Sequence, residues 1–83
     1  MTRVLFFAQL AETANVREVD VTHPNELNVR ELAELAVVDL PDKLREELFD
    51  GTVMVAVNKK RADWETRVAV GDEVAFLPPF SGG

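Results

Sequence analysis

Residues 28–37 read NVRELAELAV and predict an amphipathic helix that begins at a defined residue. Asn28 is a good N-cap, and Glu31 follows three residues later, which is the spacing of a capping box. The apolar positions recur at helical spacing and form one face: Val29, Leu32, Ala33, Ala36 and Val37. The charged residues Arg30, Glu31 and Glu34 fall on the other side. We therefore expect this helix to pack across a sheet.

The segments before the helix predict two strands. Residues 3–9, RVLFFAQ, combine β-branched and aromatic residues in a short apolar run. Residues 16–22, VREVDVT, alternate well enough for a second, more exposed strand. Residues 10–15 between them form either one helical turn or a loop. The second strand ends before Pro24, because proline has no backbone N–H to donate to a strand ladder.

A shorter helix is expected after the main one. It opens at Pro41-Asp42 and ends at Asp50-Gly51. Leu40, Leu44 and Leu48 are four residues apart and would form its apolar side.

The remainder of the chain predicts further strands. Residues 52–58, TVMVAVN, are an almost unbroken apolar run, which is typical of a strand buried on both faces. Residues 59–70 are irregular and are expected to hold one short strand. After a turn around Gly71, residues 73–77, EVAFL, predict the last strand.

The order of these elements is typical of an α+β fold. A β-grasp arrangement, with a mixed sheet and one main helix, fits this order best. A ferredoxin-like fold is the main rival, but it needs a second full-length helix near residues 60–70, where the sequence provides none. We expect one β-grasp domain over residues 1–77, followed by a flexible, extended C-terminal tail over residues 78–83.

The composition excludes several classes of function. The chain has 83 residues, no cysteine and a single histidine, so we expect no disulfide, no metal site and no bound cofactor. The net charge of −6 argues against binding to nucleic acid or to anionic membranes. No signal peptide and no apolar stretch of about 20 residues is visible, so a cytoplasmic protein is expected. Residues 10–50 carry 11 acidic and 4 basic side chains.

Side-chain alternation in the first and last strands predicts an open apolar surface. Arg3 and Glu73 each start one face of their strand, and an unpaired buried charge is costly, so these faces should point to solvent. The apolar residues on the same faces are Leu5, Phe7, Ala75 and Leu77. Uncovered apolar patches of this kind often mark contact surfaces, and we expect these four residues to contact a partner.

The C-terminal residues 78–83, PPFSGG, form the segment to which we assign chemistry. Pro78 and Pro79 stiffen the exit from the last strand, and Phe80 suggests a pocket on a partner. Ser81, Gly82 and Gly83 have almost no side chain, so they can enter a narrow channel and present an unhindered carboxylate. At about 3.3 Å per residue, the last five or six residues reach about 15–20 Å beyond the domain.

Three stretches together resemble the MoaD family, the small sulfur-carrying subunits of molybdopterin synthase. These are VLFFAQL at residues 4–10, VAVN at residues 55–58 and GDEVAFLPPFSGG at residues 71–83. The resemblance covers the chain from end to end and implies a ubiquitin-like β-grasp fold. It also places Phe7 and Leu77 at the family's interface. Arg61 stands where the family commonly has an apolar interface residue.

The resemblance implies a cycle of reactions at Gly83. A ubiquitin-activating-like enzyme would use ATP to adenylate the terminal carboxylate, and sulfur would then replace AMP to leave a thiocarboxylate. The tail would enter the large subunit of molybdopterin synthase and deliver sulfur to a cyclic pyranopterin precursor. Two small subunits would flank a dimer of the large one. The chain would then be a sulfur donor without an active site of its own.

Two alternatives stay open. The chain could be a ubiquitin-like modifier that is conjugated to other proteins through Gly83, or it could carry sulfur for thiamine, cysteine or tRNA thiolation. The only basic cluster, Lys59, Lys60 and Arg61, is either a solvated turn or a docking site for an acidic partner surface.

Overall fold

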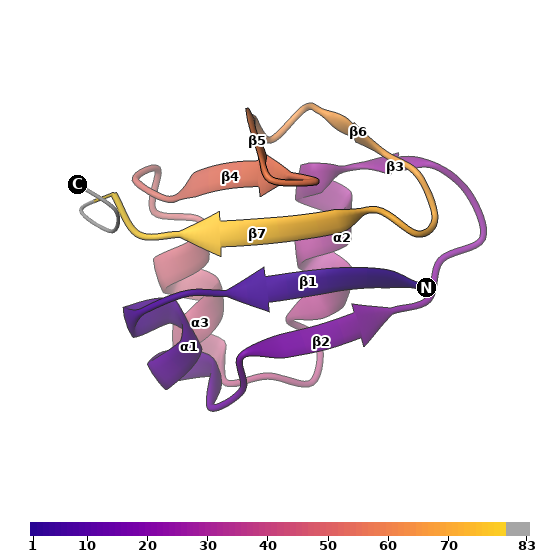
Figure 1. The fold of residues 1–83 in the computed structure, drawn as a ribbon. Coiled ribbons are helices and arrows are strands. Elements are labelled where there is room, and N and C mark those ends of the chain that lie inside the picture. Colours follow the sequence, from indigo (N-terminus) through magenta and orange to yellow (C-terminus); the bar gives the residue numbers. More distant parts are fainter. Residues whose placement is uncertain (80–83) are drawn as a thin grey trace.

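The first and last strands of the protein lie side by side at the centre of one sheet. In the computed structural model, which describes residues 1–79, β1 (Thr2–Phe6) pairs in parallel with β7 (Glu73–Leu77). β2 (Glu18–Val21) flanks β1, while β4 (Met54–Val57) and then β5 (Lys60–Ala62) follow on the side of β7. These outer pairs are all antiparallel. The mixed sheet has the β-grasp order that the sequence predicts (Figure 1).

Three helices lie on one face of the sheet (Figure 1). They are α1 (Gln9–Ala14), α2 (Val29–Ala36) and α3 (Asp42–Leu48). Both helices expected after residue 27 are present, and α1 resolves the choice that the sequence left open between a helical turn and a loop. The opposite face of the sheet carries no helix in the described part of the chain.

A second, two-stranded sheet pairs β3 (Leu27–Asn28) with β6 (Arg67–Val68). Residues 59–70 therefore contribute two strands, β5 and β6, where the sequence analysis expected one. The expectation was wrong because each strand is too short to show an alternating pattern: β6 has two residues and β5 has three.

The main helix begins as predicted. The Glu31 N–H donates to Asn28 Oδ1 at 2.8 Å, and the Asn28 N–H donates to Glu31 Oε1 at 3.0 Å. This reciprocal capping box gives hydrogen-bond acceptors to two backbone N–H groups that have no partner within the helix. It fixes α2 so that Val29, Leu32 and Ala33 are completely buried against the sheet.

The core lies between the helices and the inner face of the sheet. Phe76 is fully buried at its centre, and its ring stacks on Phe6 with centroids 6.2 Å apart. Trp64 stacks on Phe76 from another side at 5.4 Å and contacts Phe49 at 5.3 Å. Trp64 thus closes one end of the core and keeps part of its surface exposed.

The expectation that residues 52–58 form a strand buried on both faces was wrong. Within β4 only Val55 is fully buried, whereas Met54 and Ala56 are half-buried. The reason is that helices cover the inner face alone, so the alternate residues of β4 point to a surface that the described residues leave open. The apolar run reflects two different apolar faces and not a strand enclosed on both sides.

Candidate functional site

The face of the sheet opposite the helices carries an apolar patch. Alternation places Val4 and Phe6 in the core and leaves Leu5 half-buried on the other side, as the charges of Arg3 and Glu73 predict. Strand register aligns Leu5 with Ala75, and Ala75 with Ala56. The outer-face patch consists of Leu5, Phe7, Met54, Ala56, Ala75 and Leu77. Four of its six members are the residues predicted to contact a partner.

Met54 and Ala56 are members of the patch that were not among the residues predicted to contact a partner. Register places Met54 beside Leu77, and Ala56 beside Ala75, so both extend the patch across β4. Met54 and Ala56 alternate with Val53, Val55 and Val57, but all five residues are apolar, so the sequence does not show which set faces outward. Alternation reveals an open face only when polar and apolar residues take turns.

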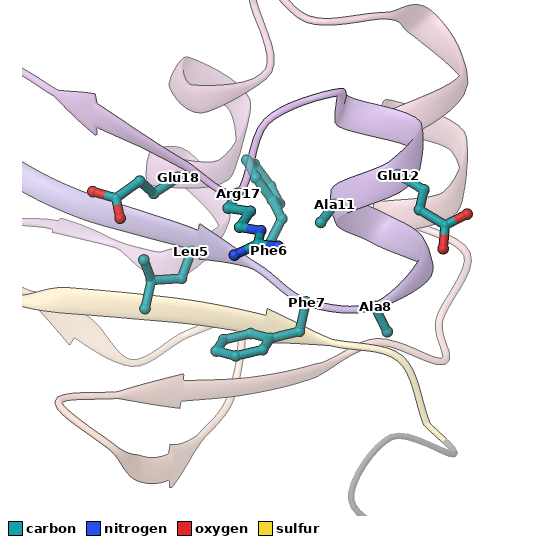
Figure 2. Close-up of a pocket in the computed structure, with 8 residues that line it drawn as sticks. All are labelled: Leu5, Phe6, Phe7, Ala8, Ala11, Glu12, Arg17 and Glu18. Carbon is teal, nitrogen blue, oxygen red and sulfur yellow. The ribbon is translucent and has the colours of Figure 1, made fainter.

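Phe7 is the aromatic residue of the patch, and 42% of its surface is accessible. Figure 2 shows its ring, with Leu5, on the outer side of β1, while Phe6 points the opposite way into the protein. The Phe7 N–H donates to Phe76 O at 3.2 Å, which holds this residue beside β7 after β1 has ended. Phe7 also lines a groove of about 550 Å³ between the end of β1 and α1.

The turn that follows Phe7 is strained. Ala8 has a φ of +51°, a conformation that favours glycine because a Cβ is crowded there. Backbone strain of this kind is often found at functional sites. Here it turns the chain sharply from β1 into α1, so that Phe7 stays at the border of the patch.

Charged residues of opposite sign stand at the two sides of the patch. On the β2 side, Glu18 is the neighbour of Leu5 and forms an ion pair with Arg3 at 3.3 Å. On the β5 side, Arg61 is the neighbour of Ala56, and no carboxylate of residues 1–79 pairs with it. Across the outer face, the side chains in register therefore change from negative at Glu18, through apolar, to positive at Arg61.

Arg61 belongs to the basic cluster, which lies on a hairpin. Asn58 and Lys59 form the turn between β4 and β5, with φ values of +50° and +69°. Positive φ at both central residues is typical of a type I′ turn, whose twist matches that of the strands. Lys59, Lys60 and Arg61 are all exposed. The structure thus brings Arg61 to the patch and leaves Lys59 and Lys60 at its corner.

The strand β7 leads from the patch to the C-terminal segment. Pro78 is buried and belongs to the packed edge of the domain, whereas Pro79 is exposed. Both proline residues line a small pocket of about 120 Å³ with α1, α3 and the Asp50–Thr52 turn. Hydrogen bonds from the Thr52 hydroxyl and backbone N–H lower the pKa of Asp50 and keep it charged beside this exit. The remaining predicted tail residues, Phe80, Ser81, Gly82 and Gly83, lie outside the described residues.

Residues 1–79 contain no group of three or more His, Cys, Asp or Glu side chains arranged to hold a metal ion. None of their helices is long and apolar enough to cross a membrane. What these residues present is the apolar outer-face patch, and β7, which carries part of it, leads into the C-terminal segment.

Comparison with known proteins identifies the family to which this chain is similar. The ThiS family matches residues 4–83. The molybdopterin synthase sulfur carrier subunits of Haemophilus influenzae and Escherichia coli are each 34% identical to this chain, over all of both chains. The crystal structure of SAMP1 from Haloferax volcanii is similar, with a TM-score of 0.82 and 30% identity over 99% of this chain and 98% of that one.

The family match spans nearly the whole chain, including the C-terminal segment that the sequence analysis singled out. The similarity to SAMP1 confirms the ubiquitin-like β-grasp fold. The identity to the two sulfur carrier subunits is spread over chains of the same size and leaves no region unmatched. The chain belongs to the ThiS/MoaD family.

Proposed function

We propose that this chain is the sulfur carrier subunit of a molybdopterin synthase, and that it donates sulfur from a thiocarboxylate at Gly83. One observation carries the proposal: the outer-face patch and the C-terminal segment share the strand β7. The names of the relatives that are 34% identical supply the pathway.

Because β7 carries part of the patch and leads into the C-terminal segment, binding of a partner to the patch also positions the segment that would deliver sulfur. Ala75 and Leu77 contribute to the patch, and Pro78 and Pro79 follow at once. A partner that binds the patch therefore fixes the point from which residues 80–83 start. These four residues span at most about 13 Å when extended, so the active site that they supply has to lie close to the docking surface on the large subunit.

The reacting group is the terminal carboxylate, which is a poor electrophile until it is activated. An adenylating enzyme would let a carboxylate oxygen of Gly83 attack the α-phosphorus of ATP, with release of pyrophosphate. A sulfur nucleophile would then attack the acyl carbon and displace AMP. We place this cycle in the cytoplasm, where ATP is available.

The expected assembly has two copies of this chain on a dimer of the large subunit. In each copy the outer-face patch, with Leu5, Phe7, Ala75 and Leu77, would bury against the large subunit. Arg61 would meet a carboxylate of that subunit, because an arginine left unpaired at an interface costs free energy. Pro79 to Gly82 would lie in the channel of the large subunit that leads to the active site.

Mass spectrometry of the intact chain tests the proposal. The chain, co-expressed with an adenylating enzyme and a sulfur donor, should gain the mass difference between a sulfur and an oxygen atom. This species should disappear when it is incubated with the large subunit and the pyranopterin precursor. Deletion of Gly83 should abolish the mass shift and leave the free energy of unfolding nearly unchanged. A stable mass shift that the large subunit cannot discharge would contradict the pathway.

The similarity to SAMP1 favours a second candidate, because that protein is titled a small archaeal modifier protein. In this role Gly83 would form an isopeptide bond with a lysine of another protein. Conjugates of higher mass that vanish on deletion of Gly83, with no thiocarboxylate formed, would support the modifier. Sulfur transfer to a thiamine, cysteine or tRNA pathway would instead leave the thiocarboxylate in place and change the acceptor.

A further inference from the structure

The free edge of β2 and the groove beside it form a second surface, separate from the outer-face patch. β2 pairs with β1 on one side only and is one of the two edge strands of the sheet. In Figure 1 the segment between α2 and α3 passes behind β2 at this border. The groove between them measures about 470 Å³.

The edge of β2 presents backbone groups that can pair with another strand. The Phe6 N–H donates to Arg17 O at 2.8 Å, and hydrogen-bonded pairs alternate along an antiparallel ladder. Register then makes Val4–Val19 and Thr2–Val21 the next hydrogen-bonded pairs. Glu18 and Asp20 therefore direct their N–H and C=O groups away from β1, toward the open edge.

The wall of the groove is apolar. Val19 and Val21 face it from β2, and α2 with the segment after it supplies the other side. Leu35 is 45% exposed and Val38 is 71% exposed, which makes them two of the six large apolar side chains exposed in residues 1–79. An edge strand beside exposed apolar side chains is the geometry in which an extended peptide adds to a sheet.

Both charged residues that line the groove are negative, whereas Arg3 of β1 lies opposite Asp20 and pairs with Glu18. Asp20 and Asp39 line it, and the lining contains no lysine or arginine. Neither aspartate has an ion-pair partner among residues 1–79. The other edge of the sheet differs, because β5 carries Lys60 and Arg61, and charged side chains on an edge discourage strand addition.

We propose that β2 binds an extended segment of another protein, which adds to the sheet as a sixth strand. Its side chains would alternate. Those beside Val19 and Val21 would be apolar and fill the groove, and those beside Glu18 and Asp20 would be Lys or Arg. The proposal does not depend on the proposed sulfur transfer, since the groove lies on the helix side of the sheet and β2 is separated from β7 by β1; the Glu18 and Asp20 side chains lie on the outer side.

A second copy of the chain is a poorer occupant. If two β2 strands paired antiparallel, Glu18 and Asp20 of both copies would lie on the same face of the joined sheet. Like charges on neighbouring strands are destabilising. The same carboxylates attract a basic segment, so charge selects a different protein as the partner.

Titration of the full-length, isotope-labelled chain with synthetic peptides tests this. The probes are KVKIKVK, the permuted control KKVIVKK of the same composition, and the acidic analogue EVEIEVE. We expect KVKIKVK to bind with a Kd between about 10 μM and 1 mM, and to slow hydrogen exchange at the Glu18 and Asp20 amides. The two other peptides should bind at least tenfold more weakly.

Surface variants locate the binding. Val38→Asp and Leu35→Glu should each weaken KVKIKVK at least tenfold, whereas Val70→Asp, at an exposed valine on another turn, should change nothing. Asp20→Lys should weaken KVKIKVK and strengthen EVEIEVE. Phe7→Asp should leave peptide binding intact, which separates this test from the proposed function.

The proposal is overturned by any of three results. The permuted peptide could bind as tightly as KVKIKVK, the Glu18 and Asp20 amides could exchange at unchanged rates, or none of the alternating peptides could bind below 1 mM. Concentration-dependent dimerisation that Val38→Asp abolishes would make a second copy the occupant and would also overturn it. Thermal unfolding of each variant confirms that the exposed substitutions leave the fold intact.

Discussion

Both faces of the central strands carry apolar side chains, but the faces differ in what covers them. On the inner face Phe6 and Phe76 are buried beneath the helices, whereas on the outer face Phe7 and Leu77 remain partly accessible. The residue types are nearly the same. What marks the open face is one charge at the start of each strand, Arg3 on β1 and Glu73 on β7. Hydrophobicity therefore identifies the strands, and the position of a few charges identifies the face that the helices leave uncovered.

The largest expected effect comes from the inner face. Phe76→Ala should lower the free energy of unfolding by about 3–5 kcal/mol, because it leaves a cavity and removes the stacking with Phe6 and Trp64. Urea denaturation followed by circular dichroism measures this. The matched control is Leu77→Ala on the next residue, which should cost well under half as much. Equal losses would mean that both faces support the fold alike.

The second prediction concerns the outer face. Phe7→Asp should weaken binding to the large subunit about a hundredfold, since a buried aromatic residue at an interface is often a hot spot. The free energy of unfolding should change by less than about 1 kcal/mol, as expected for an exposed position. Calorimetric titration and urea denaturation give the two values. A large loss in the free energy of unfolding, with the Kd for the large subunit unchanged, would show that Phe7 belongs to the core and that the two faces were assigned the wrong way round.

The third prediction concerns the N-cap of α2, the main helix that covers the inner face. Asn28→Ala should remove the cap of α2 and lower the free energy of unfolding by about 1 kcal/mol. Glu46→Ala, an exposed position on α3, is the control and should change it by less than about 0.5 kcal/mol. If Asn28→Ala were neutral in urea denaturation, packing alone would position α2.

The smallest effect is expected for the ion pair beside the outer-face patch. Arg3→Gln should lower the free energy of unfolding by no more than about 1 kcal/mol, because both side chains are exposed to water. The loss should shrink further in about 1 M salt, where screening acts within roughly 3 Å. A loss that persists at high salt would show that Arg3 contributes by packing and not by charge.

Much of the fold follows from local pattern. Asn28 and Glu31 mark the start of α2, and its apolar spacing marks the buried side. Alternation from Arg3 identifies the open face of β1 before any pairing is known. These features are readable because each depends on residues only two to four positions apart.

The remaining features depend on contacts between distant residues. β3 and β6 have two residues each and form only because Leu27 pairs with Val68 across 41 positions. His23 is buried because its Nε2 lies 2.8 Å from Thr2 Oγ1, which no local pattern indicates. Met54 and Ala56 were missed because an apolar docking face has the same residue types as a core. The groove beside β2 was missed because it exists only when α2 lies against that strand.

The position of β7 has a consequence for synthesis. This strand joins β2 and β1 on one side to β4 and β5 on the other, yet it is made after all of them. A nascent chain that ends before Glu73 has no ladder between the β1–β2 pair and the β4–β5 pair, so the five-stranded sheet cannot close until residues 73–77 leave the ribosome. Ala75 and Leu77 enter the sheet in the same step. The folded sheet and the complete outer-face patch thus arise in the same step, when β7 pairs with β1 and β4.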